Sequence, residues 1–245
     1  MNRFEVVTFD CYGTLIDWEG GISAAFHRAA ARDGVTLTRD TVLAAYAEEE
    51  PKVESEAYRS YAAVLTETAR RVAARLGWPL AADRARFLAD SIADWQPFLD
   101  TNPALERLAA AGYRLGILSN VDDALLAATR RHFGVPFEIV VTAEQVRSYK
   151  PAPAHFLEAR KRIGPSRWLH AAQSYYHDII PARALGIPTA WINRHTDLPL
   201  DSGTADYEFT TLTEFADRLA QRRSWRWSRA FMRSARAGRR TPSRL

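Results

Sequence analysis

FDCYGTL, residues 9–15, closes a short apolar run over residues 6–9 and puts the carboxylate of Asp10 where a buried strand would open into a turn. A side chain at that place in a parallel sheet points toward a ligand, because ligands of open α/β sheets bind at the carboxyl ends of the strands. The alternative is an Asp that only caps the next segment, and this motif alone does not decide between the two.

Three later segments repeat this design, in which an apolar run ends in polar side chains. The runs and the residues that follow them are 115–118 with Ser119 and Asn120, 139–142 with Lys150, and 169–172 with Gln173 and Ser174. The carboxyl ends of parallel strands meet at one edge of a sheet, so we expect these side chains to gather around Asp10.

Taken in order, these segments resemble the four sequence motifs of the haloacid dehalogenase superfamily. The matching residues are the nucleophile Asp10, then Ser119, Lys150 and an acidic fourth motif at His177-Asp178. The resemblance spans residues 4–215, and the order and spacing of the motifs make it specific. It implies an α/β fold with a Rossmann-like parallel sheet core and an inserted helical cap domain.

The pattern of the chain agrees with that organisation. Strand-like runs alternate with helical stretches, which indicates a parallel sheet covered by helices. The strand-like runs are 5–9, 114–118, 138–142, 168–172 and 189–192, and the helical stretches among them are 122–133, 153–163 and 178–185. An Ala- and Arg-rich segment lies between, with helical periodicity over 20–33, 39–49, 56–76 and 80–94. We therefore assign the core to 1–16 and 97–221, the helical cap to 17–96 and a basic tail to 222–245.

Charge divides the chain at residue 221. Residues 222–245 contain nine of the 33 basic residues and no acidic one, so the first 221 residues carry 24 basic against 29 acidic side chains, a net charge of −5. A helical tail would carry its arginines as one cationic stripe, able to contact an anionic membrane or an acidic partner. The alternative is a solvated tail that follows the Arg-rich composition. We expect no specific nucleic-acid binding, because no other motif supports it.

Composition favours an enzyme of the cytoplasm. With 245 residues, 47% of them hydrophobic, the chain can bury a sizeable core. One cysteine excludes a disulfide framework, and the N-terminal residues offer neither a signal peptide nor a membrane-spanning run. Only three lysines are present, so Lys150 in the third motif is more informative than usual. An ammonium is a compact point charge that suits a place beside a carboxylate.

Tyr12, two residues after the nucleophile, separates branches of the superfamily. Its phosphatases carry Asp there, which protonates the leaving group and helps to hold Mg²⁺. A phenol titrates near about 10 and serves neither purpose well. Halide needs no proton to leave, so the chain resembles the type II 2-haloacid dehalogenase branch, as does its segment GIPTAWINR at 186–194. We therefore expect neither a metal nor another cofactor.

The resemblance implies a two-step reaction. Asp10 attacks the carbon that bears the halogen to form an aspartyl ester, and water then attacks the ester carbonyl. Lys150 would keep Asp10 ionised. Asp178 would orient Lys150 or activate the water, and His177 is the other candidate for that role. Ser119, Asn120 and Thr14 would surround the substrate carboxylate. Further substrate contacts would come from Tyr12, Ser174 and Tyr175.

Two positions depart from the dehalogenase pattern. Those enzymes usually supply an Arg to the halide from the early cap, but residues 42–50 contain none and Arg39 is the nearest candidate. Tyr175 stands where they have an Asn. The early cap also contains a group of acidic residues, which either face a cationic substrate group or form a solvated helix face. They are Glu48, Glu49, Glu50, Glu54 and Glu56.

Two smaller signals concern the surroundings of the nucleophile. Cys11 has no nearby sequence partner and is expected to be a small buried residue. Trp18, Trp95 and Tyr12 either wall an apolar substrate pocket or only pack between cap and core.

The leading hypothesis is metal-independent hydrolytic dehalogenation of a short 2-haloacid. The alternatives are hydrolysis at another activated carbon or of a phosphate ester, and a non-catalytic binding protein of the same fold, which the missing Arg keeps open. The expected partner is a small-molecule substrate, and the chain could also form a homodimer.

Overall fold

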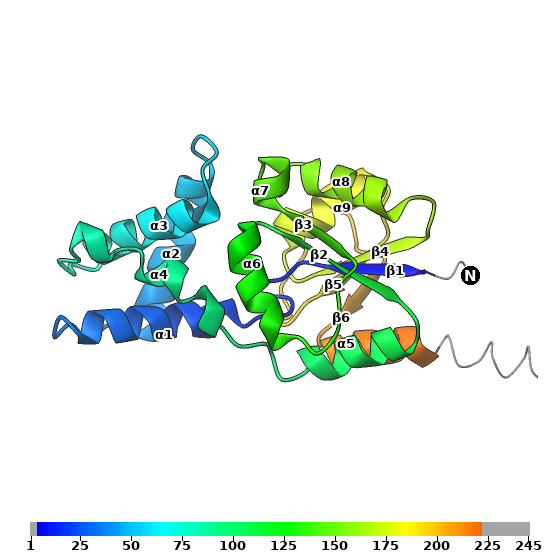
Figure 1. Ribbon diagram of the computed structural model, residues 1–245, viewed down its shortest axis with the longest axis horizontal. Helices are drawn as coiled ribbons and strands as arrows, with labels where there is room; N and C mark the ends of the chain where they lie inside the picture. The colour runs from blue at the N-terminus through cyan, green and yellow to red at the C-terminus, as the bar shows by residue number, and fades with distance from the viewer. Residues whose placement is uncertain (1–3, 222–245) are drawn as a thin grey trace, which may run out of the picture.

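Six parallel strands form one sheet in the order β3-β2-β1-β4-β5-β6 (Figure 1). This computed structural model describes residues 4–221, so the predicted cationic stripe of the tail lies outside the described residues. The strands are β1 (Val6–Phe9), β2 (Arg114–Ser119), β3 (Ile139–Thr142), β4 (Trp168–Ala172), β5 (Thr189–Ile192) and β6 (Tyr207–Phe209). The expected Rossmann-like core is confirmed. Strand β6 was not predicted, because its three residues are only partly buried and show no apolar run.

Strand β1 lies between β2 and β4, so the residue that follows it enters the middle of the sheet's carboxyl edge. All four residues of β1 are buried, as expected for a strand covered on both faces, which reads as a continuous apolar run. Phe9 is paired with Ile117 of β2 and Ala171 of β4. Asp10 therefore follows β1 at the level where β2 and β4 also end.

Helices cover both faces of the sheet (Figure 1). On one face lie α5 (Thr101–Ala110) and a helix over 212–221, which share a hydrophobic cluster with Phe9, Leu115 and Leu169. On the other lie α8 (Ala154–Ile163) and α9 (Ile180–Ala184), which pack in a second cluster with Leu118, Val141 and Trp168. The shorter helices α6 (Asp123–Thr129) and α7 (Ala143–Val146) follow β2 and β3.

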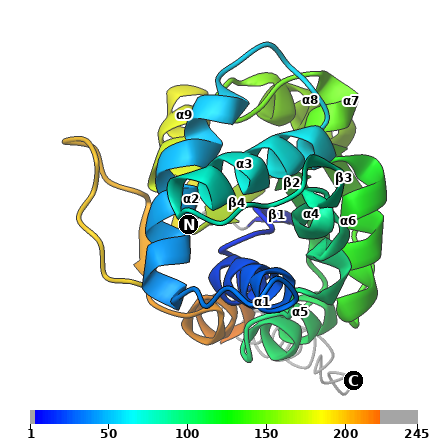
Figure 2. The ribbon, with the colours of Figure 1, turned by 90° about the vertical axis from the view of Figure 1, so that its left-hand side faces the viewer.

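Helices α1 (Trp18–Ala31), α2 (Arg39–Glu54), α3 (Tyr61–Arg75) and α4 (Phe87–Asp90) form the cap, beside the sheet in Figure 1 and facing the viewer in Figure 2. Three expected helix bounds were wrong. The stretch expected from residue 56 becomes helical only at Tyr61, where α3 begins. The stretch 80–94 holds only α4 and two 3₁₀ turns, and Ser91 bonds back to the carbonyl of Leu88 at 2.7 Å. Helix α2 runs five residues beyond 49, through Pro51, and so carries Glu54.

The chain crosses between core and cap at two adjacent points. Ile16 forms a bridge with Pro97, and the N–H of Asp17 donates to the carbonyl of Gln96 at 2.9 Å. This pairing is consistent with the predicted division of the chain into core and cap after residues 16 and 96. The division itself stays a prediction. Among residues 4–221, no helix is long and apolar enough to cross a membrane.

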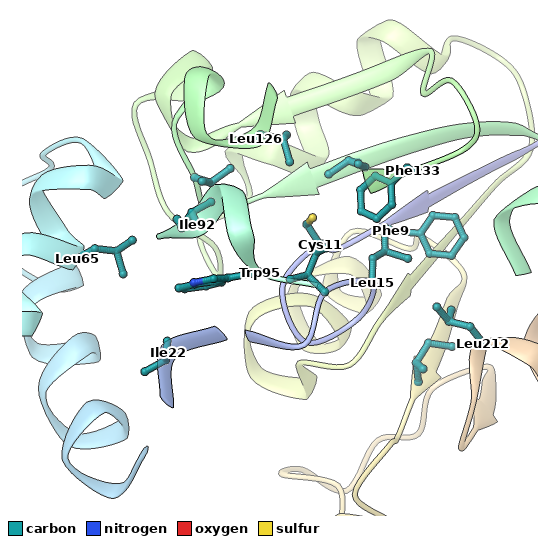
Figure 3. Close-up of a cluster of buried hydrophobic side chains, with 14 of the residues drawn as sticks. Phe9, Cys11, Leu15, Ile22, Leu65, Ile92, Trp95, Leu126, Phe133 and Leu212 are labelled. Carbon is teal, nitrogen blue, oxygen red and sulfur yellow. The ribbon is translucent and has the colours of Figure 1, made fainter. Parts of the chain in front are cut away.

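One hydrophobic cluster continues from the sheet into the cap (Figure 3). Phe9 and Leu15 belong to its core part, Ile22 and Leu65 to its cap part, and Trp95 lies where the two meet. Cys11 is fully buried in the same cluster, as expected.

A core carboxylate also holds the cap. Asp122, which follows β2, accepts hydrogen bonds from the backbone N–H groups of Tyr61 at 2.7 Å and Ala62 at 2.8 Å. These are the first two residues of α3, and the free N–H groups and positive dipole end of a helix favour a carboxylate there. The position of α3 is thereby tied to the end of β2.

Gly21 of α1 allows the close contact with Trp95, because a Cβ at position 21 would overlap the indole ring. We therefore expect Gly21→Ala to lower the free energy of unfolding by about 1–3 kcal/mol, although Ala is the better helix former. Urea denaturation measures this. Gly134→Ala is the control, since its Cβ would meet only the flexible end of Glu106, and an equal loss in both variants would contradict the explanation.

Candidate active site

Lys150 joins two carboxylates at the carboxyl edge of the sheet. Its Nζ donates to Asp10 Oδ1 at 2.8 Å, to Asp178 Oδ1 at 2.6 Å and to the carbonyl of Leu118 at 2.9 Å. The Lys150 side chain is 1% exposed and those of Asp10 and Asp178 are 10% and 1% exposed. All three protons of the ammonium are therefore used, and the sequence-predicted residues Asp10, Lys150 and Asp178 are brought together.

Burial and pairing compete in setting the charges of this cluster. Burial alone lowers the pKa of Lys150, but Asp10 and Asp178 outweigh it and raise that pKa to about 12. Burial raises the pKa of Asp10, and the charge of Lys150 opposes this. For Asp178, burial is outweighed by Lys150 and His170, which lower its pKa to about 2. Lys150 and Asp178 are thus an ion pair at neutral pH, beside a carboxylate that ionises less easily.

A buried hydrogen-bond relay, which sequence reasoning missed, holds Asp178 from behind. Trp168 Nε1 donates to Thr8 Oγ1 at 2.6 Å, and Thr8 Oγ1 lies 2.8 Å from His170 Nδ1. Asp178 is ionised and can only accept, so His170 carries its proton on Nε2 and its Nδ1 accepts the proton of the Thr8 hydroxyl. His170 Nε2 then donates to Asp178 Oδ1 at 2.9 Å. The sequence feature that could have indicated this relay is the presence of two polar residues, Thr8 and His170, inside apolar strands.

Thr14 and Asn120 act on the cluster rather than standing free for a ligand. Thr14 Oγ1 donates to Asp10 Oδ2 at 3.1 Å and accepts from the backbone N–H of Gln173 at 2.9 Å. Asn120 Oδ1 accepts from the backbone N–H of Lys150 at 2.7 Å, and its Nδ2 donates to the Lys150 carbonyl at 3.0 Å. Asn120 therefore fixes the backbone that carries Lys150.

A cavity of about 330 Å³ opens above this cluster, between core and cap. From the core it is lined by Asp10, Tyr12, Ser119, Asn120, Lys150, Gln173, Ser174, His177 and Asp178, and from the cap side by Trp18, Ile22, Tyr46, Ala47, Glu50, Pro51, Glu54, Tyr61 and Trp95. Tyr12, Trp18 and Trp95 therefore wall the cavity, and Trp95 also packs in the hydrophobic cluster. Ser119 Oγ is buried and has no hydrogen-bond partner among the described residues.

The acidic residues of the cap divide into two groups. Glu48, Glu49 and Glu56 pair at the surface with Arg75, Lys52 and neighbouring arginines. Glu50 and Glu54 line the cavity instead, which sequence reasoning did not separate from the rest. Tyr61 Oη donates to Glu50 at 3.3 Å and Asn120 Nδ2 to Glu54 at 3.1 Å. Burial is the main cause that raises their pKa values, to about 7 for Glu50 and about 8 for Glu54.

The structure also places three further residues that the sequence analysis named as candidates, His177, Tyr175 and Arg39. His177 lines the cavity; its Nδ1 lies 3.0 Å from Ser174 Oγ, and its Nε2 lies 3.9 Å from Glu54 Oε2. Tyr175 lies outside the cavity, because its ring packs against Trp191 and its hydroxyl bonds to the loop over 201–203, which corrects the expected substrate contact. Arg39 is also outside, since it pairs with Glu19 at 2.9 Å.

The residues around Asp10 do not suit a Mg²⁺ ion. The Tyr12 hydroxyl lies 2.8 Å from Thr129 Oγ1, and burial raises the pKa of its phenol well above the usual value. The position between Asp10 and Asp178 is taken by the Lys150 ammonium. Within residues 4–221, no three His, Cys, Asp or Glu side chains gather as a metal site, whereas Mg²⁺ prefers several oxygen ligands.

A parallel sheet and a helical cap with a carboxylate–lysine–carboxylate cluster between them define a two-part α/β protein whose candidate active site lies where the two parts meet. Comparison with known proteins gives the family. Residues 4–186 match the haloacid dehalogenase-like hydrolases, and the chain belongs to that family.

Individual relatives agree with this assignment. The chain is 25% identical over 228 residues to an (S)-2-haloacid dehalogenase of Pseudomonas putida, with 92% of this chain and 97% of that protein covered. It is 34% identical over 115 residues to haloacid dehalogenase-like hydrolase domain-containing protein 3 of Danio rerio, covering 43% and 48% of the two chains. A solved structure of a defluorinating L-2-haloacid dehalogenase superposes with a TM-score of 0.74 at 26% identity, covering 88% of this chain and 95% of that one.

The relay gives a prediction about stability. Thr8→Val keeps the shape of the side chain but leaves Trp168 Nε1 and His170 Nδ1 unpaired, so the free energy of unfolding should fall by about 1–3 kcal/mol. The matched control is Thr68→Val, because Thr68 is equally buried and its hydroxyl has no partner among the described residues. That variant should be neutral or stabilised in urea denaturation. Equal losses in both variants would contradict the relay.

Glu54 gives a prediction about pH. Its pKa is about 8 in the folded protein against an ordinary 4.5, so between these values the folded state binds more protons than the unfolded state. The free energy of unfolding therefore falls as pH rises through this range. Glu54→Gln keeps the bond from Asn120 and should reduce that fall by on the order of 1–3 kcal/mol between about pH 5 and pH 8.5. The exposed Glu48→Gln variant should follow the parent protein; an unchanged pH dependence in Glu54→Gln would contradict the assignment.

Proposed function

We propose that this protein hydrolyses the carbon–halogen bond of a short 2-haloacid through an aspartyl ester on Asp10. The observation that carries the proposal is the Asp10 carboxylate at the end of β1, which lines the cavity between core and cap and is held by Lys150 and Thr14. The dehalogenase names of the full-length relatives support the same reaction.

In the first step an oxygen of Asp10 attacks the carbon that bears the halogen. The new C–O bond forms as the C–X bond breaks, and the halide leaves with the bonding electron pair. No proton has to be supplied, which is consistent with a neutral, hydrogen-bonded phenol at Tyr12. Lys150 and Thr14 fix the two carboxylate oxygens of Asp10, so the nucleophile is oriented before the substrate arrives.

In the second step water attacks the carbonyl carbon of the ester. The acyl C–O bond breaks, the hydroxyacid takes a proton, and Asp10 regains its carboxylate with one oxygen from water. Asp178 Oδ2 is the candidate to hold this water, because it has no partner among the described residues and Asp178 lines the cavity. His177 remains its competitor: burial lowers the pKa of its imidazole, so it is neutral and able to accept a proton. Ser119 Oγ would bond to the substrate carboxylate or to the oxyanion.

The Tyr12 environment separates this proposal from phosphate ester hydrolysis. An alkoxide leaving group needs a proton, and the Tyr12 phenol is committed to Thr129 with a raised pKa. The cytoplasmic location and the homodimer expected from the sequence stay predictions.

The origin of the product oxygen tests the mechanism. A halide-release screen over fluorinated, chlorinated and brominated acetates and propionates, with and without an amino group, first identifies a substrate. In a single turnover with enzyme in excess in ¹⁸O-water, the product hydroxyl should be unlabelled, and mass spectrometry should find the label in the peptide that contains Asp10. Asp10→Asn should abolish halide release.

Two results would reject the proposal. Label in the product hydroxyl during the first turnover would mean that water attacks the substrate directly, and halide release from none of the acids would exclude dehalogenation. Lys150→Ala should lower activity strongly, but it also leaves buried carboxylates unpaired, at a cost of about 3–5 kcal/mol. Its folding has to be checked by circular dichroism before its activity is interpreted.

A further inference from the structure

We propose that the cavity selects substrates that carry a positively charged amine away from the reacting carbon, held by Glu50, Glu54 and the surrounding aromatic rings. This inference rests on the proposed function for the reaction at Asp10 and adds the charge of the substrate. It also assigns a role to the part of the cavity where the expected halide Arg is missing.

The charges of the cavity wall favour a cation. Four carboxylates line it, those of Asp10, Glu50, Glu54 and Asp178, against Lys150 as the only Lys or Arg among the described lining residues. The ammonium of Lys150 already donates all three protons to core acceptors. Within residues 4–221, Glu50 and Glu54 therefore have no Lys or Arg partner. Opposite charge from a ligand would be favoured in this partly enclosed site.

This part of the wall is built from hydrogen-bond acceptors and aromatic faces. Trp18 and Tyr46 lie with ring centroids 5.7 Å apart, and Tyr61 contacts Glu50 through its hydroxyl. Aromatic faces attract ammonium groups. The carbonyl of Ala47, also in the wall, cannot accept from residue 51, because that residue is Pro51 inside α2 and has no N–H.

Two buried polar atoms independently indicate that the cavity is shaped for a ligand. Ser119 Oγ and Asp178 Oδ2 belong to residues with no exposed surface, line the same cavity and have no hydrogen-bond partner among the described residues. Buried polar groups of this kind are normally satisfied. A ligand with polar groups at one end and an ammonium at the other would pair with Ser119 and Asp178 in the core and with Glu50 and Glu54 in the cap.

The acidic residues of the cap do not all lie on one solvated helix face, because some pair at the surface and others face the cavity. Glu48, Glu49 and Glu56 have basic partners at the surface, whereas Glu50 and Glu54, one helical turn apart on α2, face inward. Burial raises the pKa values of Glu50 and Glu54, so two inward carboxylates are costly to ionise, although the charge of Lys150 partly opposes this for Glu54. A bound ammonium would offset that cost.

Three small probes of equal chain length test the proposal: butylammonium, 1-butanol and butyrate. Dissociation constants come from titrations of the full chain followed by tryptophan fluorescence, since Trp18 and Trp95 line the cavity. Butyrate reports on the core end of the cavity, where Ser119 would bond to a carboxylate. Butylammonium should bind about tenfold more tightly than the neutral 1-butanol. Glu50→Gln and Glu54→Gln should each shrink this preference, and the double variant should remove it. Glu48→Gln is the matched control on the same helix and should keep it.

Binding of 1-butanol as tight as that of butylammonium, no detectable butylammonium binding, or a cation preference that survives in the double variant would each overturn the proposal. None of the probes has a leaving group, so these results do not depend on dehalogenation. Conversely, a failed ¹⁸O test at Asp10 leaves the order of probe affinities untouched, and the two proposals can fail separately.

Discussion

The buried ammonium of Lys150 between Asp10 and Asp178 is the interaction on which the rest of the site depends. A charge inside a protein is tolerated only when it is paired and its protons are bonded. Here the ends of β1 and β2 supply two of the three acceptors, and Asn120 fixes the Lys150 backbone. The sheet topology is thus a condition for the chemistry, because only a central β1 brings these groups within bonding distance.

Core and cap make different contributions to the cavity. The core supplies the reacting carboxylate and groups that hold it, and these are tied to strands and to a relay that ends at Trp168. The cap supplies most of the aromatic wall and two acids, Glu50 and Glu54, that have no Lys or Arg partner among residues 4–221. The groups around the reacting carboxylate are therefore fixed by the core, whereas the two acids proposed to recognise the remainder of a substrate both lie on α2.

The sequence predicted five of the strands, the cap and the clustering of Asp10, Lys150 and Asp178, because apolar runs that end in polar groups carry that information locally. Other features depend on distant contacts. The inward orientation of Glu50 and Glu54 follows from the continuation of α2 through Pro51, which local pattern reading ended at 49. The role of His170 depends on Thr8, 162 residues away, so no window of sequence contains it.

Asp122 binds the first turn of α3 from the end of β2, and α3 packs against α2. The helix that faces the cavity is therefore held mainly through α3. Among the contacts described here, its own inward side chains bond only from Tyr46 and Glu50 to Tyr61 and from Glu54 to Asn120. Positions 47, 50 and 54 line the cavity but lie outside the hydrophobic cluster, so they can be exchanged while the scaffold and Asp10 stay where they are. Gene duplication followed by changes at these few codons would give enzymes that share one reaction and differ in the molecules they accept.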